Sequence, residues 1–234
     1  MSDKVLVVGS GAQARISKAE RIYFANYSHT AFSDEEIIAT RAKIIGFWSA
    51  PAVFPEFFPS DDYISEHFRQ SLMRPIFSDR LVACTSQNHI PQRQLGGVPV
   101  RLMLPSDISA MMASSVRKNL PFISLTHFLA GAAAEPRKFR KLIFQLLRHW
   151  SRDSPNVGFN SYFRPSTGML ALCHAIATCG PEKSYILSGF EFGRRSSHVQ
   201  GPAFHQKSGW YRNHVIADRK ILKMLSKKFS IQIA

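Results

Sequence analysis

The sequence contains few cysteines and no long hydrophobic segment. The three cysteines, Cys84, Cys173 and Cys179, lack the spacing of a metal site, and their odd number does not support a disulfide framework. Such usage is typical of a reducing compartment. No stretch approaches the roughly 18 consecutive apolar residues of a membrane-spanning helix, and the apolar run before Gly9 is too short for a signal peptide. These absences predict a cytoplasmic protein.

Acidic residues are also scarce, with 16 Asp and Glu against 30 Lys and Arg, which gives a net charge of +14. This excess favours polyanionic partners: nucleic acid, anionic lipid, or acidic glycans and nucleotides. The basic residues are spread along the chain, however, and no basic-aromatic motif of a nucleic-acid-binding fold occurs. We therefore expect no nucleic-acid partner, and a basic nucleic-acid-binding module stays as the non-enzymatic alternative.

Hydrophobic patterning predicts an α/β fold. Continuous apolar segments are typical of parallel strands buried on both faces, and they occur at residues 4–8, 21–25, 43–48, 80–84, 184–188 and 229–233. Helical patterns occur at residues 33–40, 62–72, 106–116, 137–152, 169–178 and 217–227. A chain of 234 residues, 45% hydrophobic and 20% charged, suits one such domain. We expect a single domain over residues 1–234, with a Rossmann-like, mostly parallel sheet and helices on both faces.

The clearest amphipathic helix is predicted at residues 137–152 (RKFRKLIFQLLRHWSR). Its apolar residues, from Phe139 to Trp150, recur at helical spacing and form one stripe, while basic residues occupy most of the remaining surface. Two interpretations stay open. The stripe packs on the protein core and leaves a solvated basic face, or the helix contacts an anionic membrane or a partner subunit.

A glycine-rich loop follows the first predicted strand. Gly9, Gly11 and Ala14 fit the G-x-G-x-x-A form of the dinucleotide fingerprint, so an NAD-dependent Rossmann oxidoreductase is an alternative function. Only about nine residues remain before the second strand, which leaves room for a short helix where a dinucleotide unit needs a longer crossover. That strand ends at Asn26, where a dehydrogenase usually has an acidic residue for the ribose.

Residues 164–192 (RPSTGMLALCHAIATCGPEKSYILSGFEF) predict a loop, a helix, a turn and a strand. Pro165 to Gly168 form a turn with hydroxyl and N–H groups. The chain is then apolar nearly all round from Met169 to Thr178, as in a buried helix, which Gly180 and Pro181 end. Unpaired N–H groups and the helix dipole converge at such a helix start. The segment therefore predicts a phosphate site.

The same segment resembles the S-motif of sialyltransferases. Its longer pattern, R-x-S/T-T/S-G followed by Y-x-L-S-G-hydrophobic-acidic-F, resembles bacterial sialyltransferases that decorate lipooligosaccharide. The likeness extends to about residue 234 and returns more weakly at residues 4–26, so it covers roughly a third of the chain. It implies a GT-A-like nucleotide-binding domain that performs an inverting, metal-independent transfer of sialic acid, or a related nonulosonic acid, from a CMP-sugar to a glycan or glycolipid acceptor.

This reaction predicts neither a metal nor a cofactor. The leaving group is a monophosphate ester of low charge, hydrogen-bond donors suffice to stabilise it, and the chain has no convincing D-x-D metal motif. Animal sialyltransferases carry an N-terminal membrane anchor, which this chain does not show. We therefore expect a bacterial cytoplasmic enzyme, in peripheral contact with the inner membrane if helix 137–152 lies on anionic lipid.

The resemblance also assigns candidate site residues. His214, just before the predicted helix 217–227, is the expected base for the acceptor hydroxyl, because an imidazole accepts protons near neutral pH. Arg164 is suited to bind the donor carboxylate, and His198 lies where the family has a tyrosine that donates to the departing phosphate. The residues expected to bind the donor nucleotide are Gly9, Ser10, Gly11, Asn26, Ser166, Thr167, Gly168, Ser188 and Gly189.

Residues 193–213 form a polar, glycine-rich segment, and loops of this length are often active-site lids, so we predict a lid here. The chain departs from the family pattern at Ala50, where an asparagine contacts the donor, and at Gly193, where the first phosphate-binding tyrosine is expected. These departures keep a CMP-Kdo-type transferase as an alternative. Related enzymes commonly form homo-oligomers, which the resemblance allows here.

Overall fold

The structure, a computed structural model, describes residues 3–11, 13–49, 70, 72–83, 100–103, 107–108, 110–111, 165–190, 192 and 210–234. At residues 49 and 210–217 it describes the backbone alone. Two predicted segments, the amphipathic helix at 137–152 and the lid up to residue 209, lie outside the described residues.

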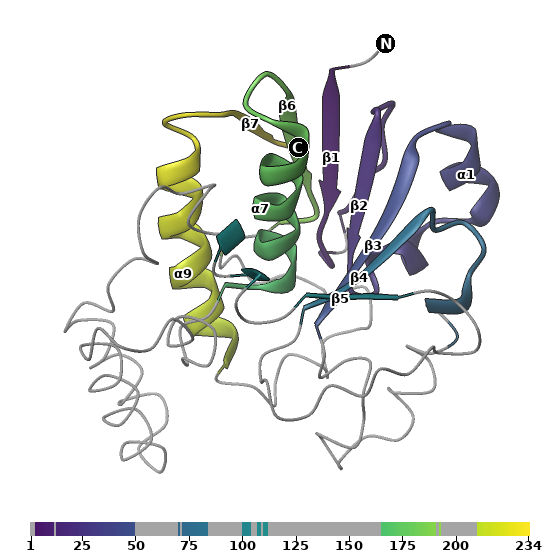
Figure 1. The fold of residues 1–234 in the computed structure, drawn as a ribbon, viewed down its shortest axis with the longest axis horizontal. Coiled ribbons are helices and arrows are strands. Elements are labelled where there is room, and N and C mark those ends of the chain that lie inside the picture. The colour runs from purple at the N-terminus through teal and green to yellow at the C-terminus, as the bar shows by residue number, and fades with distance from the viewer. Residues whose placement is uncertain are drawn as a thin grey trace.

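The described residues form a seven-stranded sheet in the order β5-β4-β3-β2-β1-β6-β7 (Figure 1). All of its pairings are parallel. The strands are β1 (Lys4–Val8), β2 (Arg21–Ala25), β3 (Lys43–Ser49), β4 (Asp79–Ala83), β5 (Arg101–Met103), β6 (Ser184–Ser188) and β7 (Ser230–Ile233). The order reverses at β1, because β2 to β5 extend from one of its edges and β6 and β7 from the other. Such a reversal marks the crevice where open α/β sheets bind ligands, outside the carboxyl ends of the strands.

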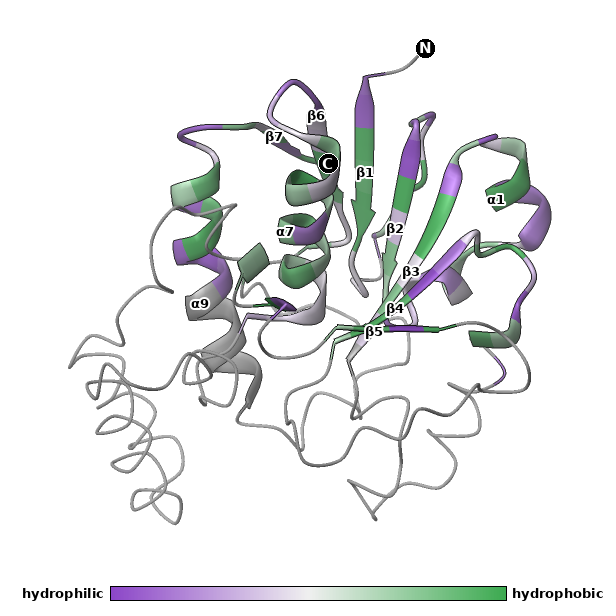
Figure 2. Ribbon diagram, in the orientation of Figure 1, coloured by the Kyte–Doolittle hydropathy of each residue, from purple (hydrophilic) through white to green (hydrophobic). Residues whose placement is uncertain are grey.

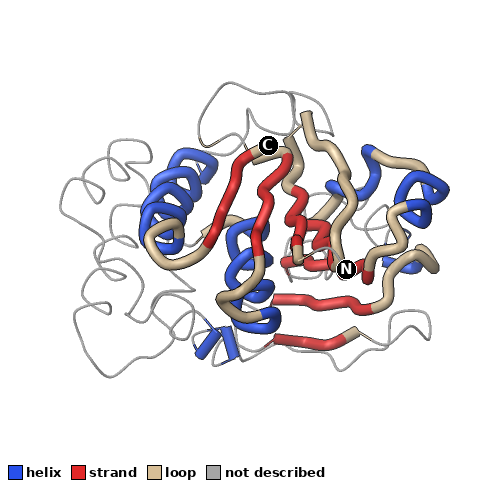
Figure 3. The backbone as a smooth tube through the Cα atoms, turned by 90° about the horizontal axis from the view of Figure 1, so that it is seen from above, coloured by secondary structure: helices blue, strands red, loops and turns tan. Residues whose placement is uncertain are grey.

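The strands contribute to two separate cores, since successive residues of a strand point to opposite faces. Val5 and Val7 lie in the core with α7 (Thr167–Cys179) and α9 (Trp210–Leu225), whereas Leu6 and Val8 lie in the core with α1 (Asp34–Ala39). Figure 2 shows that the strands consist largely of hydrophobic residues. Figure 3 shows the strands between α7 and α9 on one side and α1 on the other. Burial on both faces explains the continuous hydrophobic runs in the sequence.

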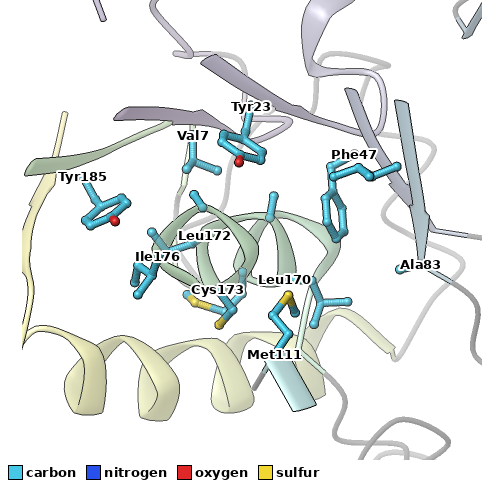
Figure 4. Packing of buried hydrophobic residues seen from close by; sticks show 14 of the residues in the cluster. Val7, Tyr23, Phe47, Ala83, Met111, Leu170, Leu172, Cys173, Ile176 and Tyr185 are labelled. Atoms are coloured by element: carbon cyan, nitrogen blue, oxygen red, sulfur yellow. The ribbon is translucent and has the colours of Figure 1, made fainter. Parts of the chain in front are cut away.

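Helix α7 lies between the sheet and α9 (Figure 4), so residues 168–176 are all buried. This position explains why its sequence has no polar face. Ser166 caps its start, and Gly180 ends it with a φ of 85°, a left-handed conformation that favours glycine. No helix in the described part of the chain combines the length and the apolar composition that crossing a membrane requires.

The predicted α/β class is confirmed, and so are most of the predicted elements. Helix α1 begins with a full capping box, in which the Glu36 N–H donates to Ser33 Oγ over 3.1 Å and the Ser33 N–H donates to Glu36 Oε2 over 2.8 Å. The helices predicted at 62–72 and 106–116 are described only in part, and those described residues are helical.

Three predictions were wrong or incomplete. Residues 13–20 contain no helix, so the chain connects β1 and β2 without the expected short helix. Helix α9 begins at Trp210 rather than at Ala217, so His214 lies inside it and not before it. The short strand β5 and the 3-10 helix η1 (Ser28–Ala31) were not predicted, since elements of three or four residues show no hydrophobic period.

Candidate nucleotide-binding site

The loops after β1 and β6 bind each other through their backbones. The Gly9 N–H donates to the Ser188 carbonyl over 2.7 Å, and the Gly11 N–H donates to the Gly189 carbonyl over 3.0 Å. Ser188 Oγ is also engaged, because it accepts the Arg15 N–H at 2.7 Å. The amides of Gly9 and Gly11 thus join the two loops instead of facing a phosphate, which corrects the role that the glycine-rich sequence suggested.

Glycine is required on both sides of this contact. A Cβ at Gly9 would lie 2.7 Å from the Gly189 carbonyl oxygen, and a Cβ at Gly189 would lie 2.8 Å from the Gly9 carbonyl oxygen. Gly189 also has a φ of 72°, which L side chains rarely adopt. Gly9 and Gly189, both predicted site residues, therefore allow the loops after β1 and β6 to approach each other closely at the sheet reversal.

We expect Gly189→Ala to lower the free energy of unfolding by about 2 kcal/mol or more, because backbone strain adds to the clash with Gly9. Gly180→Ala is the matched control, since Gly180 has a similar φ of 85° but nothing within 4 Å of an added Cβ. Gly180→Ala should lower the free energy of unfolding by only about 1 kcal/mol. Urea denaturation of both variants measures the difference, and equal losses would contradict the close contact.

Asn26 follows β2 in a left-handed conformation with a φ of 51°. Asparagine adopts this conformation more readily than other side chains do. The Asn26 N–H donates to the Phe47 carbonyl over 2.9 Å, and its carbonyl oxygen lies 3.2 Å from His29 Nδ1. Both backbone polar groups of Asn26 are thus engaged. The residue itself is half-buried and lies at the carboxyl edge of the sheet. Strained positions of this kind concentrate at functional sites.

The segment predicted as a phosphate-binding turn is the first turn of α7. Ser166 Oγ caps the helix by accepting the Met169 N–H at 3.2 Å, and Thr167 and Gly168 are already helical. Among the described residues, no acceptor pairs with the N–H groups of Thr167 and Gly168, because the first amides of a helix have no partner within it. These two N–H groups and the helix dipole are available to an anion.

Phe190 joins the start of α7 to the loop after β1, and the sequence analysis missed it. A Cβ at Gly168 would lie 2.7 Å from the Phe190 ring and 3.8 Å from Ala25 Cβ, and a Cβ at Gly9 would lie 3.2 Å from the same ring. The ends of β1, β2 and β6 and the start of α7 therefore meet at one place. Figure 1 shows this end of α7 beside the arrowheads of the strands. The G-F-E-F motif after β6 was the signal in the sequence.

Asp218 of α9 lies buried against the start of α7. Its Oδ1 accepts the Ser166 N–H at 2.9 Å. Burial raises the pKa of the Asp218 carboxyl to about 7, although hydrogen bonds from the Ser166 side chain and backbone oppose the shift. A buried acid with a perturbed pKa beside a candidate site is a marker of function. The sequence analysis used Asp218 only as part of a helix pattern and did not select it.

The three predicted catalytic residues are described unequally. His214 lies in α9, one helical turn before Asp218, and only its backbone is described. Arg164 and His198 lie outside the described residues, as do Ala50 and Gly193. The predicted nucleotide residues fall into two groups. Among the described residues, the N–H groups of Thr167 and Gly168 have no acceptor, whereas the described polar contacts of Gly9, Gly11, Asn26, Ser166 and Ser188 are made within the protein.

His174 is a core residue and not a second base. It lies between the rings of Tyr23 and Phe47, with centroids 5.8 and 5.9 Å away. Its Nε2 lies 3.3 Å from Arg101 Nη2, so the guanidinium donates to an unprotonated ring nitrogen. Burial, together with the Arg101 charge, lowers the pKa of His174 to about 4, and the ring is neutral at physiological pH.

Within the described ranges, no three His, Cys, Asp or Glu side chains are grouped so as to hold a metal ion. Comparisons of the chain with protein-family models, with curated proteins and with solved structures found no match. The fold itself defines the class: an α/β protein with a Rossmann-like parallel sheet, whose strand order reverses beside the start of α7.

Proposed function

We propose that this protein is an inverting, metal-independent glycosyltransferase that moves sialic acid, or a related nonulosonic acid, from a CMP-sugar to a glycan or glycolipid acceptor. The observation that carries the proposal is the start of α7. It offers two N–H groups that have no acceptor in the described part of the chain, at the sheet reversal and next to the end of β2 and its Asn26. A phosphate monoester has the negative charge that such a helix start favours.

The proposed reaction is a single displacement. The acceptor oxygen attacks the anomeric carbon while the bond from that carbon to the phosphate oxygen breaks, which inverts the configuration. The proton of the acceptor hydroxyl passes to His214, and CMP leaves with the bonding electron pair. The Thr167 and Gly168 N–H groups stabilise the charge that develops on the phosphate. Arg164 would orient the donor carboxylate and His198 would donate to the phosphate.

Two features of the described residues argue against the oxidoreductase alternative. A dinucleotide site needs a helix N-terminus directly after β1 to bind the pyrophosphate. Residues 13–20 contain no helix, and the Gly9 and Gly11 amides are used by the loop after β6. A CMP-Kdo-type transferase would use the same phosphate site and differs only in the sugar.

A thermal-shift panel of CMP, CDP, UDP, NAD and AMP tests the donor class. We expect CMP to raise the melting temperature more than the other nucleotides do, because a ligand that binds only the folded state stabilises it by mass action. A response to NAD without one to CMP would restore the oxidoreductase. No response to CMP at millimolar concentration would contradict the proposal.

A pair of variants at Thr167 tests the phosphate site itself. Thr167→Pro removes one N–H from the first helical position, where proline fits, and Ser166 before it already has a compatible φ of −64° and ψ of 161°. We expect CMP to bind about 10- to 100-fold more weakly, the loss of one charge-assisted hydrogen bond. Thr167→Ala is the matched control, since it keeps the N–H. Calorimetric titration showing equal affinities for the two variants would rule out this amide as a ligand.

A further inference from the structure

Helix α9 is fixed to the proposed phosphate site through two adjacent residues. Asp218 accepts the N–H of Ser166, the capping residue of α7, at 2.9 Å. Its neighbour Arg219 donates to the carbonyl of Phe192, just beyond β6. Further along α9, Ile221 and Leu225 are fully buried in the core shared with α7. The apolar contacts hold the second half of the helix, and the polar ones hold its middle.

Stability alone does not account for an acid at this position. Burying a carboxylate costs more than the hydrogen bonds from the one residue Ser166 return, and an apolar side chain in such a place is often neutral or stabilising. The raised pKa of Asp218 reports the same cost. The hydrogen bond, however, is directional, so it specifies where α9 lies along the start of α7 in a way that apolar packing does not.

The position of Asp218 relates it to the proposed base. His214 is four residues earlier in the continuous helix α9, so the two residues lie on one face and about 6 Å apart along the axis. The other end of the hydrogen bond is Ser166, directly before the two N–H groups of the proposed phosphate site. One bond therefore connects the turn that carries the base to the turn that would carry the leaving group.

We propose that Asp218 is a positioning residue, whose carboxylate holds the His214 turn of α9 in register with the first turn of α7. The inference rests on the proposed function for its catalytic consequence. Proton transfer and displacement need both groups within a narrow range of distances, and a misplacement of about 1 Å can cost about 100-fold in rate. Asp218 touches neither reactant in this role.

Three variants test the proposal. Asp218→Ala removes the acceptor, and we expect kcat with CMP-sialic acid to fall about 10- to 100-fold with a smaller change in the KM for the donor. Asp218→Asn keeps an amide oxygen that accepts the Ser166 N–H, so it should retain most of the activity. Leu225→Ala is the matched control, because it destabilises α9 by leaving a cavity but leaves the hydrogen bond in place.

The outcomes separate positioning from simple stabilisation. A loss of kcat in Asp218→Ala but not in Leu225→Ala at equal melting temperature supports the proposal. Unchanged kcat in Asp218→Ala, or equal losses in Asp218→Ala and Asp218→Asn, would overturn it. Should Asp218→Ala not fold, Asp218→Leu serves as a second variant without an acceptor and is judged by the same criteria.

Hydrogen–deuterium exchange distinguishes a failure of this inference from a failure of the proposed function. Faster exchange at residues 166–169 in Asp218→Ala, but not in Asp218→Asn or Leu225→Ala, supports the connection between the helices even if the wild type transfers no sugar from a CMP donor. Unchanged exchange at these residues would overturn the positioning role whatever the activity is.

Discussion

His214→Ala is expected to lower kcat for transfer from a CMP-sugar by about 10²- to 10⁴-fold, the usual contribution of a general base. Binding of CMP should be unchanged, because the proposed phosphate contacts are made by α7 and not by α9. Transfer of sialic acid from CMP-sialic acid to a glycan acceptor, together with the CMP-induced rise in melting temperature, measures the two effects separately.

Lys223→Ala is a suitable control for this experiment, since Lys223 is exposed on the same helix and lies about two and a half turns beyond His214. It should leave both readouts unchanged. If His214→Ala kept full activity, the base would have to be another group, and Asp218 would be the first to examine. If it lost CMP binding as well, His214 would belong to the donor site instead.

Asp218→Asn is expected to gain stability over the wild type as the pH rises from about 4 to about 7. The Asp218 pKa is raised from 3.8 to about 7 in the folded protein, so the folded state holds a proton there that the unfolded state has released. Stability from this group is fully present below pH 4 and is lost as the pH rises through 7. At about 1.4 kcal/mol for each pKa unit, the loss is on the order of 4 kcal/mol, which Asp218→Asn avoids.

The titration of two other buried groups, Cys173 and His174, has to be considered in this measurement. On α7, the Cys173 thiol faces Asp218, and burial raises its pKa far enough to keep it neutral throughout the range. No charged side chain among the described residues shifts the Asp218 pKa. His174 acts in the opposite sense: its lowered pKa contributes stability that is lost as the pH falls from about 6.5 to about 4.

The wild-type profile alone would therefore mix two opposing effects, and the difference between wild type and Asp218→Asn isolates one of them. Urea denaturation at several pH values between 4 and 8 should show this difference growing up to about pH 7 and then becoming constant. Parallel curves for the two proteins would mean that the Asp218 carboxyl titrates normally, and hence that it is not buried as described.

Much of the fold follows from short-range patterns in the sequence. Both faces of the parallel strands are covered, so strands such as β1 and β2 appear as uninterrupted apolar segments with the same bounds in sequence and structure. The caps behave in the same way, because Ser33 and Gly180 act on residues only a few positions away.

The connections between distant segments were not accessible to such reasoning. The sequence around Gly9 predicted a short helix and a nucleotide contact, but the carbonyl groups of Ser188 and Gly189 accept the Gly9 and Gly11 N–H groups, and residues 13–20 contain no helix. The Arg15 N–H and its acceptor, Ser188 Oγ, are 173 positions apart in the sequence. Likewise, Phe190 and Asp218 acquire their roles only through contact with the start of α7.

By itself, then, the sequence determined the α/β class, the bounds of the central strands and the presence of a helix that begins at a glycine- and hydroxyl-bearing turn. Only the tertiary structure decided which polar groups at that edge are paired: those of Gly9, Gly11 and Ser166 have acceptors, whereas the Thr167 and Gly168 amides have none among the described residues. The reason is physical. Local pattern governs which backbone conformation each segment adopts, whereas the partner of a hydrogen-bonding group is whatever the folded chain brings within about 3 Å of it.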